Sequence, residues 1–316
     1  MTTKCYAVTG SAGFIGARVA TALTGKGHVV IGLPTLIDVL ALLLDPEDVP
    51  QKLDGVFHLG AVSSTVEHDT HKLLEHNVNC TDQLYQWCWK NEVPFVYASS
   101  AAVYGDGAYG FDDRWGAPLE ELRPLSPYAW SKWEADKRIA SLTRAGIEPP
   151  RWYGCRIFNC YGPGEEGKKD QASYPHKAIH AFRDGTSIKL FKGSEEYRRD
   201  FVHVDDVVDV MLWLMDEDNP WPRPASGFLN IGTGFATSFT AVLDMVAYVV
   251  RSPNAMIVDH VDMPDHLVGR YQRYTCAQLD RLQATHCPRP RPLSRGLMDF
   301  AAALPPLPPA GTDGGR

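Results

Sequence analysis

The sequence has few cysteines, no long apolar run and no excess of positive charge. Its seven cysteines among 316 residues lack the spacing of metal ligands, so we expect no metal site and reduced thiols in a cytosolic setting. The longest apolar stretch, 36–44, is interrupted by Asp38 and is too short to span a membrane. A net charge of −7 argues against nucleic acid as a main partner.

The first residues, MTTK, run directly into an apolar segment without the pattern of a signal peptide. Together with the absence of an apolar span, this predicts a cytoplasmic protein with no membrane partner. A chain of 316 residues is long enough to bury a full core and to form one large domain with a smaller lobe.

Apolar segments that suit buried strands alternate with segments of helical period along the first half of the chain. This order predicts an α/β fold of the Rossmann type, with a doubly wound parallel sheet and a smaller C-terminal substrate-binding lobe. We expect residues 1–158 and 200–232 to form the dinucleotide-binding domain, and 159–199 and 233–303 the lobe. Residues 304–316 are rich in proline and glycine, which predicts a disordered tail.

Three glycines, Gly10, Gly13 and Gly16, stand directly between the first expected strand, 5–10, and the first expected helix, 14–24. In this position the first glycine permits a tight turn, the second lets a pyrophosphate approach the backbone, and the third lets the helix pack on the strand. The pattern predicts binding of a dinucleotide.

The choice between NAD and NADP stays open. An acidic residue is expected at the end of the second strand, where it would bind the ribose, but the sequence there is IGLPTL. Asp38 lies farther along the chain, and we interpret it as a helix-capping residue. The segment has no nearby arginine or lysine to bind a 2′-phosphate.

Tyr128 and Lys132 are four residues apart in a predicted helix, and Ser100 follows the buried strand 93–100. The spacing places phenol and ammonium on one helix face, where the ammonium can lower the pKa of the phenol. Such a spacing also occurs in surface pairs. Together with the glycine motif it predicts an acid/base pair, with Ser100 hydrogen-bonded to the reacting oxygen.

Three further observations concern residues around this pair. Asn77 suits a helix interior, where its amide could brace a catalytic loop. Lys168 and Lys169 lie in a polar loop after the strand that contains Asn159. They are either a solvated charge cluster or functional, as a second acid/base opposite Tyr128 or a phosphate contact. Alanines occupy the two positions after Ser100, where dehydratases of this general type have an Asp–Glu pair, which argues against dehydration.

These motifs make the chain resemble the extended short-chain dehydrogenase/reductases, and within them the ADP-L-glycero-D-manno-heptose 6-epimerase family. The superfamily strings are GSAGFIG, ASSAAVYG, YAWSK and RIFNCYGP. The family strings are AVSSTVEHD, KLFKGSEEYRRDFVHVDDV and MPDHLVGRYQRYTCAQLDRL. The chain departs from the family in its shortened segment between the second and third strands and in Leu59, which replaces an acidic residue.

The resemblance implies specific roles for individual residues. The implied catalytic residues are Ser100, Tyr128, Lys132 and Lys168. The implied contacts with NAD or NADP are Gly10, Ala12, Gly13, Phe14, Ile15, Gly16, Ala61, Asn77, Tyr128 and Lys132. The implied substrate contacts are Ser64, Ser100, Asn159, Lys177, Phe191, Arg199, Arg270 and Tyr271.

The resemblance also implies an activity, inversion at C6 of a nucleotide-activated heptose through a transient 6-keto species. The alternative within enzymes is a C4 epimerase or dehydrogenase of another nucleotide sugar. An alternative from another class is a non-catalytic dinucleotide-binding sensor, which has no need of the acid/base residues. Relatives in the superfamily associate through helices, so we expect a homo-oligomer.

Overall fold

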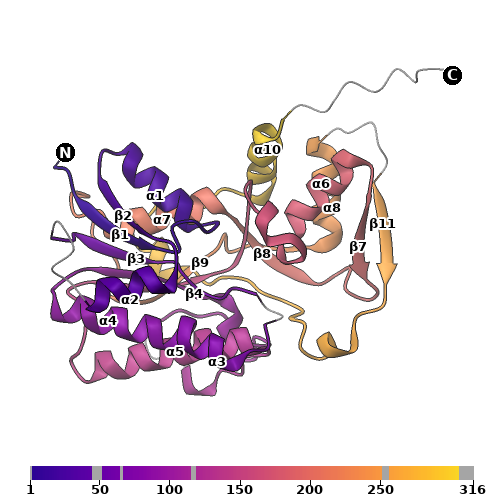
Figure 1. Ribbon diagram of the computed structural model, residues 1–316. Helices are drawn as coiled ribbons and strands as arrows, with labels where there is room; N and C mark the ends of the chain where they lie inside the picture. The colour runs from indigo at the N-terminus through magenta and orange to yellow at the C-terminus, as the bar shows by residue number, and fades with distance from the viewer. Residues whose placement is uncertain (1, 45–51, 65–66, 115–118, 251–255, 306–316) are drawn as a thin grey trace.

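A six-stranded parallel sheet forms the centre of the larger part of the molecule (Figure 1). The computed structural model describes residues 2–44, 52–64, 67–114, 119–250 and 256–305. The strands lie in the order β2-β1-β3-β4-β5-β9. Their bounds are β1 Cys5–Thr9, β2 Val29–Leu33, β3 Gly55–His58, β4 Phe95–Ser100, β5 Trp152–Ile157 and β9 Gly227–Ile231.

Helices cover both faces of this sheet, because successive strand residues point to opposite sides and both sets are apolar. In β1, Cys5 and Ala7 pack into one hydrophobic core cluster, whereas Tyr6 and Val8 pack into another. Figure 1 shows α1 and α7 on one face and α2, α4 and α5 on the other. Their bounds are α1 Gly16–Gly25, α2 Leu36–Leu44, α4 Cys80–Lys90, α5 Pro127–Arg144 and α7 Val204–Met215. The predicted doubly wound fold is confirmed.

A smaller lobe, at the right in Figure 1, has its own sheets and core. One sheet has the order β10-β8-β6, and β11 pairs with β7. The strands are β6 Asn159–Tyr161, β7 Ser187–Phe191, β8 Arg198–His203, β10 Ala236–Ser238 and β11 Ile257–Val261. The larger helices are α6 Tyr174–Asp184, α8 Phe239–Val250 and α10 Leu293–Ala303. The proposed domain boundaries stay a prediction, and most of the predicted tail lies outside the described residues.

The remaining helices are short. They are α3 Thr70–Leu73, η2 Leu74–Asn79, η3 Ala101–Tyr104, η4 Leu119–Glu121, η5 Glu166–Gln171, η6 Asp265–Leu267 and α9 Asp280–Gln283. The π-helical turn η2 leads directly into α4, and β5 is followed closely by the separate strand β6. Within the described ranges, no helix is both long and apolar enough to cross a membrane.

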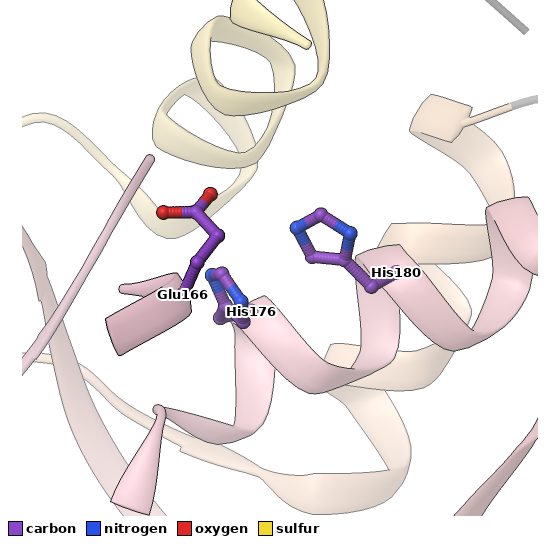
Figure 2. Close-up of side chains that lie close together, drawn as sticks. All are labelled: Glu166, His176 and His180. Atoms are coloured by element: carbon purple, nitrogen blue, oxygen red, sulfur yellow. The ribbon is translucent and has the colours of Figure 1, made fainter. Parts of the chain in front are cut away.

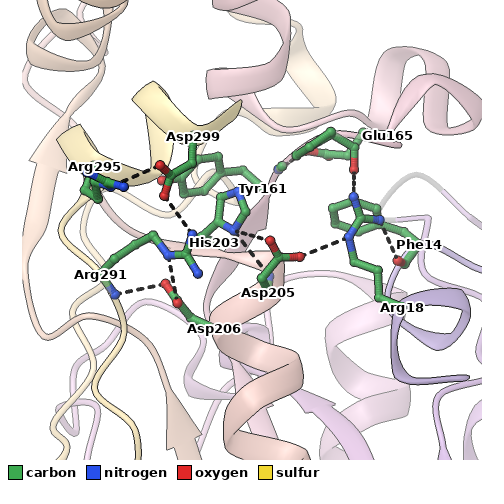
Figure 3. A network of polar contacts seen from close by, with 12 residues as sticks. Phe14, Arg18, Tyr161, Glu165, His203, Asp205, Asp206, Arg291, Arg295 and Asp299 are labelled. Atoms are coloured by element: carbon green, nitrogen blue, oxygen red, sulfur yellow. Dashed lines mark hydrogen bonds and ion pairs between the residues drawn. The ribbon is translucent and has the colours of Figure 1, made fainter. Parts of the chain in front are cut away.

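Polar contacts connect the nucleotide-binding end of the sheet to the smaller lobe (Figure 3). Arg18 on α1 pairs with Asp205 at the start of α7 at 3.3 Å and donates to the carbonyl oxygen of Pro163. Arg291 bonds to Asp206 at 2.9 Å and to Asp299 on α10 at 2.8 Å. The start of α7 is thus held from both sides, which fixes the lobe beside the carboxyl edge of the large sheet.

Candidate active site

The glycine-rich turn is packed so closely that side chains would not fit in it. Gly10 has a φ of +61°, and a Cβ there would lie 2.7 Å from Gly60 Cα. A Cβ at Gly16 would overlap the carbonyl group of Gly10. The N-cap residue of α1, Ile15, supplies no side-chain cap. The Ala17 N–H donates to the Gly13 carbonyl oxygen at 2.9 Å, and the positive end of the helix favours an anion at this turn. Ala12 and Gly13 form the exposed crest of this turn.

A cavity of about 230 Å³ lies beside this turn, where β1 and β3 end. Ala61 and Gly60 line it together with Thr9, Gly10, Pro34, Thr35, Leu36, Val39, His58, His76 and Cys80. A glycine cradle with an adjacent, mostly apolar cavity at the carboxyl edge of a parallel sheet fits a dinucleotide. A larger hollow of about 710 Å³ lies among Pro94, Arg151 and Ser226. These residues precede β4, β5 and β9, so that hollow is at the opposite edge of the sheet.

His58 and two threonines form the polar floor of this cavity. The His58 ring has hydrogen bonds with the Thr9 hydroxyl at 2.7 Å and with the Thr81 hydroxyl at 3.0 Å. Thr9 in turn accepts from the backbone N–H groups of Leu59 and Gly60. Burial, assisted by the charge of Lys132, lowers the pKa of His58 to about 3. The ring is therefore neutral at physiological pH and serves to shape the loop after β3.

Asp38 caps a helix, as the sequence analysis predicted. Its carboxylate accepts from the Thr35 N–H at 2.8 Å and from the Thr35 hydroxyl at 2.5 Å. Its own N–H donates back to Thr35 Oγ1 at 3.3 Å, which completes a reciprocal capping box at the start of α2. The Thr35 hydrogen bonds lower the pKa of Asp38. Because its carboxylate is engaged in this way, Asp38 is not placed to select between NAD and NADP.

Ser100 and Tyr128 come together at the carboxyl end of β4. Ser100 is the last residue of β4 and Tyr128 lies in the first turn of α5, whose start is capped by Ser126 and favoured by Pro127. The Ser100 hydroxyl lies close enough to the phenol to affect its pKa. Burial raises the pKa of Tyr128, and the nearby Ser100 hydroxyl opposes this rise.

Lys132 lies beneath this pair in a buried position. Its Nζ donates to the carbonyl oxygen of Ala98 at 2.8 Å. Burial lowers the pKa of Lys132 to about 8, against the opposing charges of Asp136 and Cys80. The expected lowering of the Tyr128 pKa by this ammonium stays a prediction. The helical spacing puts both groups on one face, but the ammonium bonds to the end of β4.

Replacing Lys132 by methionine should stabilise the fold and impair the reaction. The ordinary pKa of 10.5 falls to about 8, which corresponds to a burial cost of about 3 kcal/mol for the charged form, offset by about 1 kcal/mol for the lost hydrogen bond. The stability advantage of K132M over wild type should shrink between about pH 8 and pH 10.5, because over this range unfolded wild type keeps the Lys132 proton that the folded state has lost, which favours the folded wild type. Urea denaturation of both proteins across this range should show the difference in free energy of unfolding becoming smaller. A less stable variant would contradict this.

Asn77 braces the loop after β3, as predicted from its place in a helix interior. Its side-chain Oδ1 accepts from the Val62 N–H at 2.8 Å, and its Nδ2 donates to the Val62 carbonyl at 2.9 Å. Nδ2 also bonds to Ser131 Oγ, between Tyr128 and Lys132 in α5. Asn77 sits in the π-helical turn η2, a local irregularity that is frequent at functional sites. Its direct contact with a dinucleotide stays a prediction.

A buried ion pair supports the catalytic helix from below. Asp136 on α5 and Arg156 on β5 are 3.0 Å apart, with side chains 0% and 3% exposed. Asp136 also accepts from the Tyr97 hydroxyl at 2.8 Å, and Arg156 donates to Tyr104 at 3.1 Å. The Tyr104 hydroxyl continues to Asn230 on β9. These contacts join α5 to three strands and to η3, which follows Ser100.

Lys168 lies next to the glycine-rich turn. Its Nζ is 3.2 Å from the buried carboxylate of Glu165 and 3.7 Å from the centroid of the Phe14 ring. Arg18 lies over the same ring at 5.2 Å. Glu165 also accepts from Gly162 N–H and from the hydroxyl and N–H of Ser173. Lys168 is thus held by an ion pair, and its expected acid/base role stays a prediction.

An arginine and several aromatic rings form one wall of the smaller lobe. Arg199 on β8 lies 5.2 Å from the Tyr271 ring, and the Phe191 ring meets the Tyr271 ring edge-on at 5.6 Å. These three predicted substrate contacts are therefore brought together. Two further aromatic residues belong to the same wall. Tyr197 stacks on Tyr271, and Phe239 lies under the guanidinium of Arg199. The sequence analysis missed both, because no local pattern distinguishes them from packing residues.

The other predicted substrate contacts are more dispersed. Asn159 accepts from the Thr275 hydroxyl at 3.4 Å, beside the end of the wall. Lys177 is exposed on α6 and donates to the Asp170 carbonyl at 2.6 Å. Arg270 is exposed in the turn before Tyr271, and Ser64 is partly buried in the loop braced by Asn77. The geometry does not bring these four side chains into one group.

Sequence and structure comparisons agree with this arrangement. The family described as "NAD dependent epimerase/dehydratase family" matches residues 6–232. MoeE5 in complex with UDP-glucuronic acid and NAD is 26% identical, with a TM-score of 0.75 and coverage of 95% of this chain and 98% of that chain.

Two further solved structures are similar to the chain. A novel NAD-dependent NDP-hexosamine 5,6-dehydratase involved in tunicamycin biosynthesis is 25% identical, with a TM-score of 0.74 and coverage of 95% of this chain and 97% of that chain. The ADP-L-glycero-D-manno-heptose-6-epimerase of Helicobacter pylori is 22% identical, with a TM-score of 0.72 and coverage of 96% and 97%. The last likeness establishes the fold alone.

Proposed function

Because the chain belongs to the NAD dependent epimerase/dehydratase family, we propose that it inverts C6 of a nucleotide-activated heptose of the ADP-glycero-manno type. The observation that carries a reaction of this kind is the proximity of Tyr128 and Ser100 at the carboxyl edge of the sheet, with buried Lys132 beneath them. In this proposal the substrate is a nucleotide sugar and the cofactor is NAD or NADP.

The heptose assignment is supported by two sequence strings that form one wall. Residues 189–207 and 263–282 carry the strings typical of heptose 6-epimerases. They lie against each other, since Arg198 N–H donates to the Arg273 carbonyl at 3.0 Å and Thr275 N–H donates to the Arg198 carbonyl at 3.1 Å. Arg199 and Tyr271, one from each string, stack. This wall suits the nucleotide and sugar of an activated heptose.

The residues around the glycine turn would hold the dinucleotide, with its pyrophosphate against the backbone at Ala12, Gly13, Phe14 and Ile15 and its adenosine in the cavity lined by Ala61. When bound, its nicotinamide supplies the hydride acceptor and donor of the reaction. Tyr128 Oη takes the proton from the C6 hydroxyl, and Ser100 Oγ hydrogen-bonds to the same oxygen. Lys132 supplies positive charge beneath them.

An alternative, epimerisation or oxidation at C4 of another nucleotide sugar, draws on the 26% identity to MoeE5, whose structures contain UDP-glucose or UDP-glucuronic acid with NAD. Dehydration, the activity of the 25% identical hexosamine dehydratase, is disfavoured by Ala101 and Ala102, which provide no carboxylate beside Ser100. A non-catalytic sensor is disfavoured because it would not need Lys132, whose burial lowers the stability of the fold.

The proposal is tested by incubating the purified protein with ADP-D-glycero-D-manno-heptose and following the C6 configuration by NMR. We expect conversion to a mixture of the two C6 epimers. Samples with UDP-glucose and UDP-glucuronic acid run in parallel. Conversion of either of these at C4, with the heptose left unchanged, would contradict the C6 assignment and establish the alternative.

The activity of a Lys168 variant distinguishes the proposed C6 reaction from the alternative C4 reaction. A second acid/base on the other face of C6 is required by the proposed inversion, so K168A should lower kcat by about 10²-fold or more. Lys169 is its exposed neighbour in the same loop, and K169A is the matched control, expected to retain activity. Steady-state kinetics of both variants provide the measurement. If K168A kept full activity, Lys168 would not be the second acid/base of the reaction.

A further inference from the structure

Two histidines and a glutamate gather in the smaller lobe, apart from the Ser100–Tyr128 pair. His176 and His180 lie four residues apart on α6, which places them on one face of the helix, and Glu166 is the first residue of η5. Their ligand atoms all lie within 4.8 Å of one another. Figure 2 shows both rings on adjacent turns of α6, with the Glu166 carboxylate beside them and α10 above.

Both rings present a buried nitrogen that has no hydrogen-bond partner in the described part of the chain. These atoms are Nδ1 of His176 and Nε2 of His180, and His176 is only 8% exposed. Buried nitrogens of this kind are rare in folded proteins, because each unmet hydrogen bond costs about 1–3 kcal/mol. Two such atoms, on residues whose ligand atoms gather with that of a glutamate, indicate a missing ligand.

We propose that Glu166, His176 and His180 bind one divalent transition-metal ion, with Zn²⁺ the best match. Two imidazole nitrogens and one carboxylate oxygen are typical zinc ligands, whereas Mg²⁺ and Ca²⁺ prefer oxygen ligands alone. Tetrahedral bonds of about 2.0–2.1 Å place ligand atoms roughly 3.4 Å apart. The exposed Glu166 side chain supplies the movement that closes the cluster to this size.

The bound ion would join two segments of the lobe and lie near a third. Glu166 opens the segment that carries Lys168, α6 supplies both histidines, and the Phe300 ring of α10 lies 5.6 Å from the His176 ring and 6.3 Å from the His180 ring. The apolar contact with Phe300 limits the access of water to one side. The ion thus fixes the lysine loop to the lobe. This inference replaces the sequence-based expectation of no metal site, which considered only the cysteines.

The test uses the full chain after dialysis against a chelator. Isothermal titration with Zn²⁺ should give one site per chain, the melting temperature should rise with added Zn²⁺, and Co²⁺ should give the visible absorption of a tetrahedral complex. E166Q and H180Q should each weaken binding by at least about tenfold. E166Q changes an exposed side chain, so it keeps the test decisive even if H180Q does not fold.

The control is H71Q. His71 and Glu75, in the larger part of the molecule, form an exposed pair at 3.8 Å and are also four residues apart. The H71Q variant should bind Zn²⁺ as tightly as wild type. The proposal is overturned if wild type shows no stoichiometric Zn²⁺ binding, or if E166Q binds Zn²⁺ as tightly as wild type. These measurements do not use the enzyme's activity, so their outcome is independent of the proposed function.

Discussion

Replacing Tyr128 by phenylalanine is expected to lower kcat by roughly 10²–10⁴-fold, the range for loss of one general acid/base. Only the phenolic oxygen is removed, and this oxygen is the proposed proton acceptor next to Ser100. The ring still fills its partly buried position on α5, so the free energy of unfolding should change little. Steady-state kinetics with the heptose substrate, together with urea denaturation, provide the measurement.

The control for Y128F is Y271F. Tyr271 is a partly buried tyrosine of the lobe wall, packed against Arg199 and Tyr197 through its ring. Under the proposal it contacts substrate without proton transfer, so loss of its hydroxyl should act mainly on KM and spare kcat. If Y128F kept full activity, the proton-transfer role of Tyr128 would be wrong.

The second large effect concerns stability. Changing Asp136 to asparagine should lower the free energy of unfolding by about 3–5 kcal/mol, because it leaves the Arg156 guanidinium buried without its counter-charge. Arg156 is 3% exposed and retains a hydrogen bond only to the neutral Tyr104 hydroxyl. The loss should be measured by urea denaturation near pH 7.

The matched control breaks an exposed pair on the same helix. Arg144 and Glu120 are 3.2 Å apart, with side chains 59% and 62% exposed, and water screens such pairs strongly. E120Q should therefore leave the urea midpoint close to that of wild type. A D136N variant as stable as E120Q would show that the Asp136–Arg156 pair does not support the catalytic helix.

The fold and the nucleotide-binding turn were predictable because their signals are local. Strand and helix periods appear within ten or so residues, and the glycines at 10, 13 and 16 are required by close backbone packing that the structure shows directly. The capping role of Asp38 was also predictable, because Thr35 and Asp38 have the three-residue spacing of a capping box. Ser100 and Tyr128 could be paired because the carboxyl ends of parallel strands meet at one edge.

Contacts between distant segments were less predictable. Phe239 reaches Arg199 only because α8 folds back on β8, and Lys168 meets Glu165 and Phe14 through a loop whose course has no sequence period. The ammonium of Lys132 donates to the carbonyl oxygen of Ala98, a partner on another element that helical spacing does not predict. His176 and His180 are four residues apart on α6, a spacing that is visible in the sequence. Glu166, the third member of the cluster, belongs to η5 and is not indicated by that spacing.

The central claim is that C6 is oxidised transiently and receives the same hydrogen back. The most direct test is turnover of ADP-D-glycero-D-manno-heptose labelled with deuterium at C6, in ordinary water, followed by NMR and mass spectrometry. The account predicts that the C6-inverted product keeps the deuterium at C6. Replacement of the label by solvent hydrogen would indicate inversion by proton removal at carbon and would contradict the account.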